Sequence, residues 1–215
     1  RPAAASPEMS SGANPIGRSI PVARIADMLL QPGEPFEFNG RNDVYPDIQM
    51  IYWAGGNPFH HHQDLNRLVR AWNKPQTIVV HDSWWTPTAR RADIVLPATT
   101  TLERNDIGGS SRDRFVLAMH QALAPHAQSR NDFDIYRELA AMGGYEVAFT
   151  GGRDEFQWIR HIYDGMAAGW RESGFDAPGF EDFWRAGHLE LPEPTREFVL
   201  FEDFRHDPAA HPLRT

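Results

Sequence analysis

Two short apolar runs decide the predicted fold. Residues 48–57 read Ile-Gln-Met-Ile-Tyr-Trp-Ala-Gly-Gly-Asn, and residues 77–82 read Thr-Ile-Val-Val-His-Asp. Consecutive apolar positions are typical of parallel strands that are buried on both faces. A helical pattern separates the two runs, and a third run, residues 93–96, is stopped by Pro97. This order predicts an α/β fold, with a Rossmann-like, open, mainly parallel sheet and flanking helices.

The rest of the chain predicts a division into three parts. Residues 1–46 contain recurring Pro and Gly and are expected to be an irregular lead-in with one short helix near residues 22–29. Residues 47–150 are expected to form the α/β domain, which includes a strand near 114–119 and a helix near 132–142 that begins with a Ser129–Asp132 capping box. Residues 151–215 are expected to be a helical extension and linker, with a last strand at 198–201.

Composition excludes several classes of function. The 215 residues carry a formal net charge of −8, which argues against a nucleic-acid-binding protein. Cysteine is absent, so no thiolate chemistry is available, and no apolar run approaches the length of a membrane span. The chain begins at Arg1 without an initiator Met, and both ends read like cuts in a longer protein, which predicts an incomplete fragment of a larger multidomain enzyme.

The first candidate site combines the glycine pair with the end of the next strand. Ligands of open parallel sheets bind beyond the carboxyl ends of the strands. Gly55-Gly56-Asn57 there allows close approach of a phosphate, and the following helix start offers N–H groups to an anion. Asp82 lies at about the distance expected of an acid that binds a ribose or base edge, roughly 20 residues beyond the glycines. The full GxGxxG pattern is missing, so a simple turn is the alternative.

Other polar groups allow a functional and a structural interpretation. The run His60-His61-His62 suggests a metal, but consecutive side chains point in different directions, which favours a helix flank. Glu103 and Asp106 suggest an acid–base pair, while Arg104 between them favours a salt-linked loop or an anion-binding fork. Trp84 and Trp85 fit either a substrate funnel or a buried aromatic pair, and the buried pair is favoured.

Several longer strings resemble the dimethyl sulfoxide reductase family of molybdopterin oxidoreductases. Ala-Asp-Ile-Val-Leu-Pro at 92–97 is broad across molybdopterin enzymes. Asn-Asp-Phe-Asp at 131–134 continues the family match. Two narrower strings, Gly-Gly-Asn-Pro-Phe-His-His-His at 55–62 and Glu-Arg-Asn-Asp-Ile at 103–107, are similar to the branch of trimethylamine N-oxide, dimethyl sulfoxide and biotin sulfoxide reductases, and residues 20–25 and 36–40 also resemble that branch.

This resemblance implies a role within a larger enzyme. Such enzymes carry molybdenum in a bis(molybdopterin guanine dinucleotide) cofactor and reduce an S-oxide or N-oxide by oxygen-atom transfer. The matching positions that would contact the guanine dinucleotide are Asn57, His61, His81, Asp82, Arg104 and Asp134. The serine that ligates the metal in the family lies upstream, so no catalytic or metal-ligating residue is assigned in this chain, and the isolated segment is expected to be inactive.

The resemblance also leads to expectations about the parent enzyme. Its electron donor would be a protein such as a c-type cytochrome. Its location would be the periplasm, or the cytoplasm for an enzyme of the biotin sulfoxide reductase type. The competing hypothesis is a stand-alone, Rossmann-like nucleotide-binding module without redox activity. Open reading frame on either side of the encoding sequence would remove that alternative.

Overall fold

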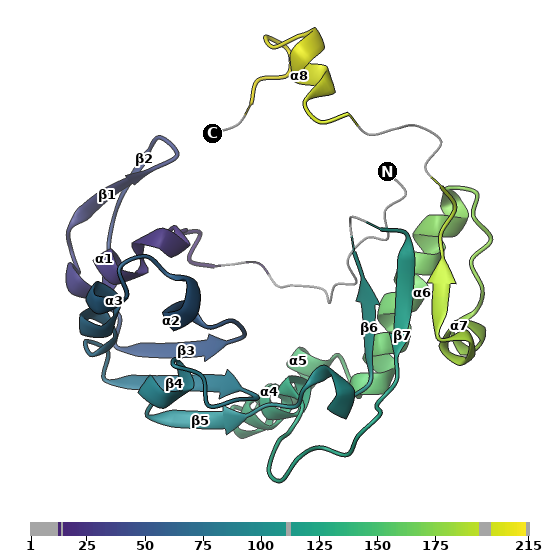
Figure 1. Ribbon diagram of the computed structural model, residues 1–215, viewed down its shortest axis with the longest axis horizontal. Helices are drawn as coiled ribbons and strands as arrows, with labels where there is room; N and C mark the ends of the chain where they lie inside the picture. Colours follow the sequence, from purple (N-terminus) through teal and green to yellow (C-terminus); the bar gives the residue numbers. More distant parts are fainter. Residues whose placement is uncertain (1–12, 14, 111–112, 194–198, 214–215) are drawn as a thin grey trace. The chain divides into compact units, whose positions relative to one another are not determined.

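The computed structural model describes residues 13, 15–110, 113–193 and 199–213 (Figure 1). The chain contacts divide into two compact units. The described residues up to 104, together with 123–149, form one, which we call the parallel-sheet unit. The described residues of 105–122 and of 150–213 form the antiparallel-sheet unit. The three-part division predicted from the sequence, with boundaries at residues 46/47 and 150/151, stays a prediction. The compact units do not follow it, because residues 105–122 pair with a later strand.

The parallel-sheet unit contains the predicted α/β sheet. Strands β3 (Met50–Ala54), β4 (Thr77–Asp82) and β5 (Ile94–Pro97) pair in parallel in the order β3-β4-β5. The mainly parallel sheet with flanking helices is therefore confirmed. Only the central strand β4 is buried along most of its length. The expectation that residues 48–54 are buried on both faces is wrong, because β3 is an edge strand of this sheet and alternates between exposed and half-buried positions.

A compact apolar core lies against the sheet. Helix α3 (Leu65–Trp72) connects β3 to β4 and buries Leu68, Ala71 and Trp72 beside Val80 of β4. The predicted short helix of the lead-in is present as η1 (Val22–Arg24) and α1 (Ile25–Leu30), and α1 packs on α3. Buried apolar surface is the main stabilising contribution to such a unit.

Part of the lead-in forms a hairpin that the sequence prediction omitted. Strands β1 (Pro35–Phe38) and β2 (Arg41–Val44) pair antiparallel around Asn39-Gly40. Both turn residues have positive φ, 51° and 71°, which is the backbone that an Asn-Gly hairpin turn requires. The expectation of an irregular lead-in is therefore wrong for this segment.

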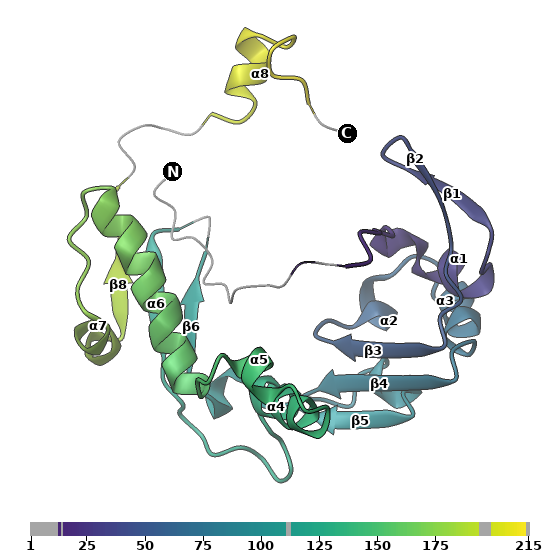
Figure 2. The ribbon, with the colours of Figure 1, turned by 180° about the vertical axis from the view of Figure 1, so that it is seen from behind.

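Helices and turns around the carboxyl ends of the strands complete the unit. These are α2 (Pro58–His61), η2 (Ala89–Arg91), η3 (Thr101–Glu103), α4 (Asp132–Met142) and α5 (Glu146–Thr150). Helix α4 lies beside the arrowheads of β4 and β5 in both views (Figures 1 and 2). It begins after Asn131, whose side chain makes no cap, so the predicted Ser129–Asp132 capping box is wrong.

The antiparallel-sheet unit has its own core. Strands β6 (Asp106–Gly109), β7 (Phe115–Met119) and β8 (His188–Glu190) pair antiparallel, and α6 (Glu155–Glu172) and α7 (Phe180–Ala186) pack on them. Tyr163 stacks on Phe183 with ring centroids 4.3 Å apart. Burial raises the pKa of Tyr163 to about 12, against the opposing effect of Arg171.

The chain after this core differs from the predicted strand at 198–201. Phe198 lies outside the described residues, and Val199–Phe201 form no strand before helix α8 (Glu202–His206) begins. Among the described residues, no helix has the length and apolar character that crossing a membrane would require.

Candidate functional site

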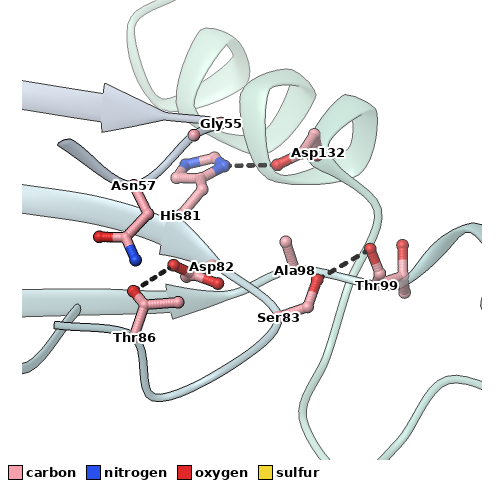
Figure 3. A pocket seen from close by; sticks show the side chains of 10 residues that line it. Gly55, Asn57, His81, Asp82, Ser83, Thr86, Ala98, Thr99 and Asp132 are labelled. Carbon is pink, nitrogen blue, oxygen red and sulfur yellow. Dashed lines mark hydrogen bonds and ion pairs between the residues drawn. The ribbon is translucent and has the colours of Figure 1, made fainter. Parts of the chain in front are cut away.

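A pocket of about 330 Å³ lies at the carboxyl ends of β3 and β4 (Figure 3). It belongs entirely to the parallel-sheet unit. Its walls come from the last two residues of β4, from the loops after β3, β4 and β5, and from the first residue of α4: Gly55, Gly56, Asn57, His81, Asp82, Ser83, Thr86, Ala98, Thr99 and Asp132. The location is the one that parallel sheets use for ligands. Three of the six predicted site residues, Asn57, His81 and Asp82, line it.

The glycine pair shapes one wall through its backbone. Gly55 and Gly56 have φ of 79° and 74°, in the left-handed region that side chains disfavour. A Cβ added at either position would meet no atom within 4 Å, so conformation and not crowding requires glycine here. The next residue, Asn57, accepts a hydrogen bond at 2.5 Å from the hydroxyl of Thr88, which is fully buried. This bond fixes which way the Asn57 amide faces.

The helix start after the glycines has fewer N–H groups to offer an anion than a longer helix without proline would have. Helix α2 has four residues and begins with Pro58, which has no N–H. The N–H groups of His60 and His62 bond to the carbonyls of Asn57 and Pro58. His61, predicted to contact the dinucleotide, is exposed at the end of α2 and does not line the pocket.

Asp82 ends β4 with its carboxylate held in place. Oδ1 accepts from the backbone N–H of Trp84 at 3.0 Å, and Oδ2 accepts from the hydroxyl of Thr86 at 2.6 Å. The loop that supplies these donors exposes Trp84 and Trp85 at 72% and 68%, so the favoured buried aromatic pair is wrong. Two donors on one carboxylate orient it toward the pocket, and each oxygen keeps a further lone pair for a ligand.

His81, the residue before Asp82, is buried with both ring nitrogens engaged. Nδ1 lies 2.7 Å from Oδ1 of Asp132, and Nε2 lies 2.5 Å from the hydroxyl of Tyr52. Tyr136, one turn after Asp132 on α4, stacks on the imidazole with ring centroids 5.0 Å apart. Burial, together with Tyr136 and Asp132, raises the pKa of Tyr52.

The loop after β5 holds the predicted Arg104 outside the pocket wall. Its guanidinium donates to the carbonyl of Thr99 at 3.2 Å, and Ser83 donates to the same carbonyl at 3.2 Å. Glu103 accepts from the N–H and hydroxyl of Thr100 and from the N–H of His126. These bonds, first those from Thr100, lower the pKa of Glu103. Glu103 is therefore engaged in fixing the loop.

Helix α4 presents a different acid to the pocket from the one that the sequence selected. The predicted residue, Asp134, pairs with Arg137 at 3.1 Å and does not line the pocket. Asp132, two residues earlier, does. Positions two apart on a helix lie about 200° apart around its axis, so the two acids face different ways. Asp132 shares a face with buried Ile135, three residues later, and this spacing was the signal that could have selected it.

The polar groups of the pocket are mostly hydrogen-bond acceptors. Asp82 and Asp132 bring two carboxylates, while none of the lining residues is Lys or Arg. Such a wall suits a ligand group that is rich in N–H and O–H donors, and it disfavours a phosphate. Among the described residues, no three His, Cys, Asp or Glu side chains are grouped so that they could hold a metal ion.

Comparison with known proteins places this chain in a family. The molybdopterin oxidoreductase family matches residues 22–142, more than half of the chain. The sequence is 53% identical over 211 residues to a biotin sulfoxide reductase of Cereibacter sphaeroides, covering 98% of this chain and 28% of that protein. It is 48% identical to a dimethyl sulfoxide/trimethylamine N-oxide reductase of Rhodobacter capsulatus, covering 91% and 24%.

A solved structure agrees at the level of the fold. Acetylene hydratase from Pelobacter acetylenicus is similar with a TM-score of 0.52 at 20% identity, over 70% of this chain and 19% of that one. The chain spans about a quarter of the length of the curated relatives it matches. The sequence match covers both the parallel sheet and every residue of the pocket. The chain therefore belongs to the molybdopterin oxidoreductase family.

Proposed function

We propose that this chain is a segment of a molybdenum-dependent S-oxide or N-oxide reductase, and that it binds the guanosine end of a molybdopterin guanine dinucleotide. The observation that carries the proposal is the oriented carboxylate of Asp82 in a pocket at the carboxyl end of a parallel sheet. The relatives support the enzyme class, since they are named as sulfoxide and N-oxide reductases.

The pocket fits a guanosine by size and by chemistry. Its volume of about 330 Å³ lies at the lower end of the usual range for small-ligand sites, about 300–1,000 Å³. Guanine presents a ring N–H and an amino group side by side, and a carboxylate such as that of Asp82 can accept from both. Ser83, Thr86 and Thr99 add hydroxyl groups that suit a ribose.

The diphosphate would then lie outside the acidic pocket. Arg104 is the predicted residue best suited to it, because a guanidinium binds phosphate oxygens as a planar fork. His61 and Asp134 remain predicted contacts that would have to reach the dinucleotide from outside the pocket wall. Asn57, with its amide fixed by Thr88, is available to the sugar or the base.

In this account the chain's residues bind and orient, and the reaction occurs elsewhere. The bound cofactor would supply oxygen-atom transfer at molybdenum, with electrons from a donor such as a c-type cytochrome. The residues described here would hold the nucleotide end and so fix the position of the pterin. A periplasmic location, or a cytoplasmic one for a biotin sulfoxide reductase type, remains part of the proposal.

The test is Asp82→Ala in the full-length enzyme. Molybdenum and acid-released GMP are measured per mole of purified protein. We expect both to fall at least about tenfold, because the ring N–H and the amino group of the bound guanine would lose the charged carboxylate that accepts their hydrogen bonds. Asp182→Ala, an exposed acid paired with Arg185, serves as control and should retain both. Full occupancy of Asp82→Ala would refute the assignment.

The alternative, a stand-alone nucleotide module, makes the opposite prediction for the isolated chain. It requires the 215 residues to melt cooperatively and to bind GMP without pterin. We expect neither, because the matching segment makes up only about a quarter of the length of each relative.

A further inference from the structure

We propose that Thr88, a fully buried residue outside the pocket wall, is a positioning residue that turns the amide nitrogen of Asn57 toward the ligand. The inference rests on the proposed function and deepens it, because it names the residue that sets which atom of Asn57 meets the guanosine. Thr88 would thereby make the pocket selective for a ligand group that accepts a hydrogen bond.

The burial of Thr88 fixes the direction of its hydrogen bond. Thr88 is 0% exposed, and within the described part of the chain its hydroxyl has one hydrogen-bond partner, Oδ1 of Asn57. A buried hydroxyl hydrogen without an acceptor is costly, so the hydroxyl donates and the side-chain carbonyl of Asn57 accepts. The opposite orientation of the amide would leave that hydrogen unpaired. The amide nitrogen of Asn57 therefore faces away from Thr88.

The turn that carries Thr88 is held against the segment that carries Asn57. Arg91 donates its backbone N–H to the carbonyl of Thr88 at 3.0 Å and its guanidinium to the carbonyl of Pro87 at 2.9 Å. The same guanidinium lies over the ring of Phe59, 4.6 Å from the centroid. Because Phe59 is two residues after Asn57, a second contact joins η2 to α2. The hydroxyl of Thr88 therefore cannot move away from the amide without breaking that contact.

The other side chains of the pocket leave few donors for a ligand. Its three hydroxyl groups donate their hydrogens inside the protein, to a backbone carbonyl, a carboxylate and a side-chain amide, respectively: Ser83, Thr86 and Thr99. A hydroxyl has one hydrogen, so these donors are used. Both ring nitrogens of His81 are also bonded within the protein. Among the described residues that line the pocket, the amide nitrogen of Asn57 is then the side-chain donor that lacks an acceptor in the protein.

A donor placed beside acceptors matches one edge of guanine. Guanine carries a carbonyl oxygen next to its ring N–H and amino group. In the proposed function Asp82 accepts from those two donors, and Asn57 then supplies the donor that the carbonyl oxygen needs. Figure 3 shows the amide nitrogen of Asn57 on the side of Asp82. Adenine has an amino group in place of that oxygen, so an amide oriented in this way disfavours it.

The test compares cofactor retention among variants of the full-length holoenzyme. Acid-released GMP per protein is followed during dialysis, and melting of each variant checks its fold. Thr88→Val replaces the hydroxyl by a methyl group, so the carbonyl of Asn57 turns to the water in the pocket, and binding must return it to an apolar neighbour. We expect the cofactor to be lost about tenfold faster, whereas Thr88→Ser, which keeps the hydroxyl, should retain it.

Thr150→Val is the matched control for this test. Thr150 is also a buried threonine, and its hydroxyl accepts a hydrogen bond from the N–H of Gly152 in a part of the chain that does not line the pocket. Retention should be that of the wild type. Equal retention by Thr88→Val and Thr150→Val, with both proteins folded, would overturn the proposal.

A double variant separates positioning from a general effect on the structure. If Thr88 acts through Asn57, Thr88→Val combined with Asn57→Ala should lose cofactor no faster than Asn57→Ala alone. A further tenfold loss in the double variant would mean that Thr88 acts by another route and would overturn the positioning role.

Asn57→Asp tests the amide nitrogen itself, and it carries the test should Thr88→Val fold poorly. The new carboxylate can still accept from the hydroxyl of Thr88, but it offers the pocket a second acceptor in place of the donor. The cofactor should therefore be lost at least about tenfold faster. Normal retention would contradict the inferred direction of the amide.

The outcomes also separate this inference from the proposed function. Loss of cofactor in Asp82→Ala together with normal retention in Thr88→Val would overturn only the role of Thr88. Normal retention in Asp82→Ala would overturn the guanosine site itself. A tenfold loss in Thr88→Val with wild-type melting, restored in Thr88→Ser and absent on top of Asn57→Ala, would support both.

Discussion

Replacing Thr86 by valine should loosen the carboxylate of Asp82 while leaving the shape of the loop almost unchanged. The substitution removes the hydroxyl that donates to Asp82 Oδ2 at 2.6 Å and accepts from the N–H of Ala89 at 3.2 Å. A hydrogen bond to a charged group contributes about 1.5–3 kcal/mol, and the partial exposure of this pair places the loss near the lower value.

This loss should appear mainly in cofactor binding. Asp82 keeps its bond from Trp84 N–H at 3.0 Å, so the carboxylate stays in the loop but can rotate. Binding must then restore the lost orientation, and about 1.5 kcal/mol corresponds to roughly a tenfold weaker hold on the cofactor. The assay is molybdenum and GMP retained by the full-length enzyme during dialysis.

The matched control is Thr77→Val, the same change at the opposite end of β4. It should retain cofactor as the wild type does. Retention by Thr86→Val equal to that of Thr77→Val, with both proteins folded, would refute the view that an oriented Asp82 holds the guanosine.

Two further predictions concern stability. Leu68→Ala leaves a cavity at a fully buried position between α3 and the sheet, which should lower the free energy of unfolding by about 2–5 kcal/mol. Amide hydrogen exchange in β4 should therefore accelerate, and unchanged exchange would contradict the assigned core. The pKa of Glu103 is lowered by its hydrogen bonds, so its stabilising contribution is complete above the ordinary value of 4.5 and is lost as the pH falls below it. The free energy of unfolding of Glu103→Gln should therefore decrease less steeply than that of the wild type as the pH falls. Identical pH profiles of the two proteins would contradict this role.

Local sequence patterns predicted most of the elements of the fold. The run Thr77–Asp82 and the spacing of Leu68 and Trp72 specify a buried strand and the helix that covers it, and both are present. The pairing of β7 with β8 was not predictable in the same way, because it joins residues about 70 positions apart through contacts that leave no local pattern. The Asn39-Gly40 hairpin, in contrast, had a local signal that the prediction did not use.

The candidate site was predictable only in part for a similar reason. Gly55, Gly56 and Asp82 follow from a rule about the ends of parallel strands. Asp132 reaches the pocket from a helix about 50 residues later, where it bonds to His81 in a contact between distant parts of the sequence. To choose between Asp132 and Asp134, one must know which face of α4 is turned toward the sheet. The spacing of Asp132 to buried Ile135 indicates that face, whereas the family resemblance does not.

The measurement that tests the central claim most directly is a crystal structure of the full-length enzyme loaded with its cofactor. The account predicts that the guanine of one dinucleotide occupies the pocket lined by Gly55, Asp82 and Asp132, with its ring N–H and amino group within hydrogen-bond distance of a carboxylate. A fully loaded enzyme whose guanines both lie elsewhere, with only water beside Asp82, would contradict it.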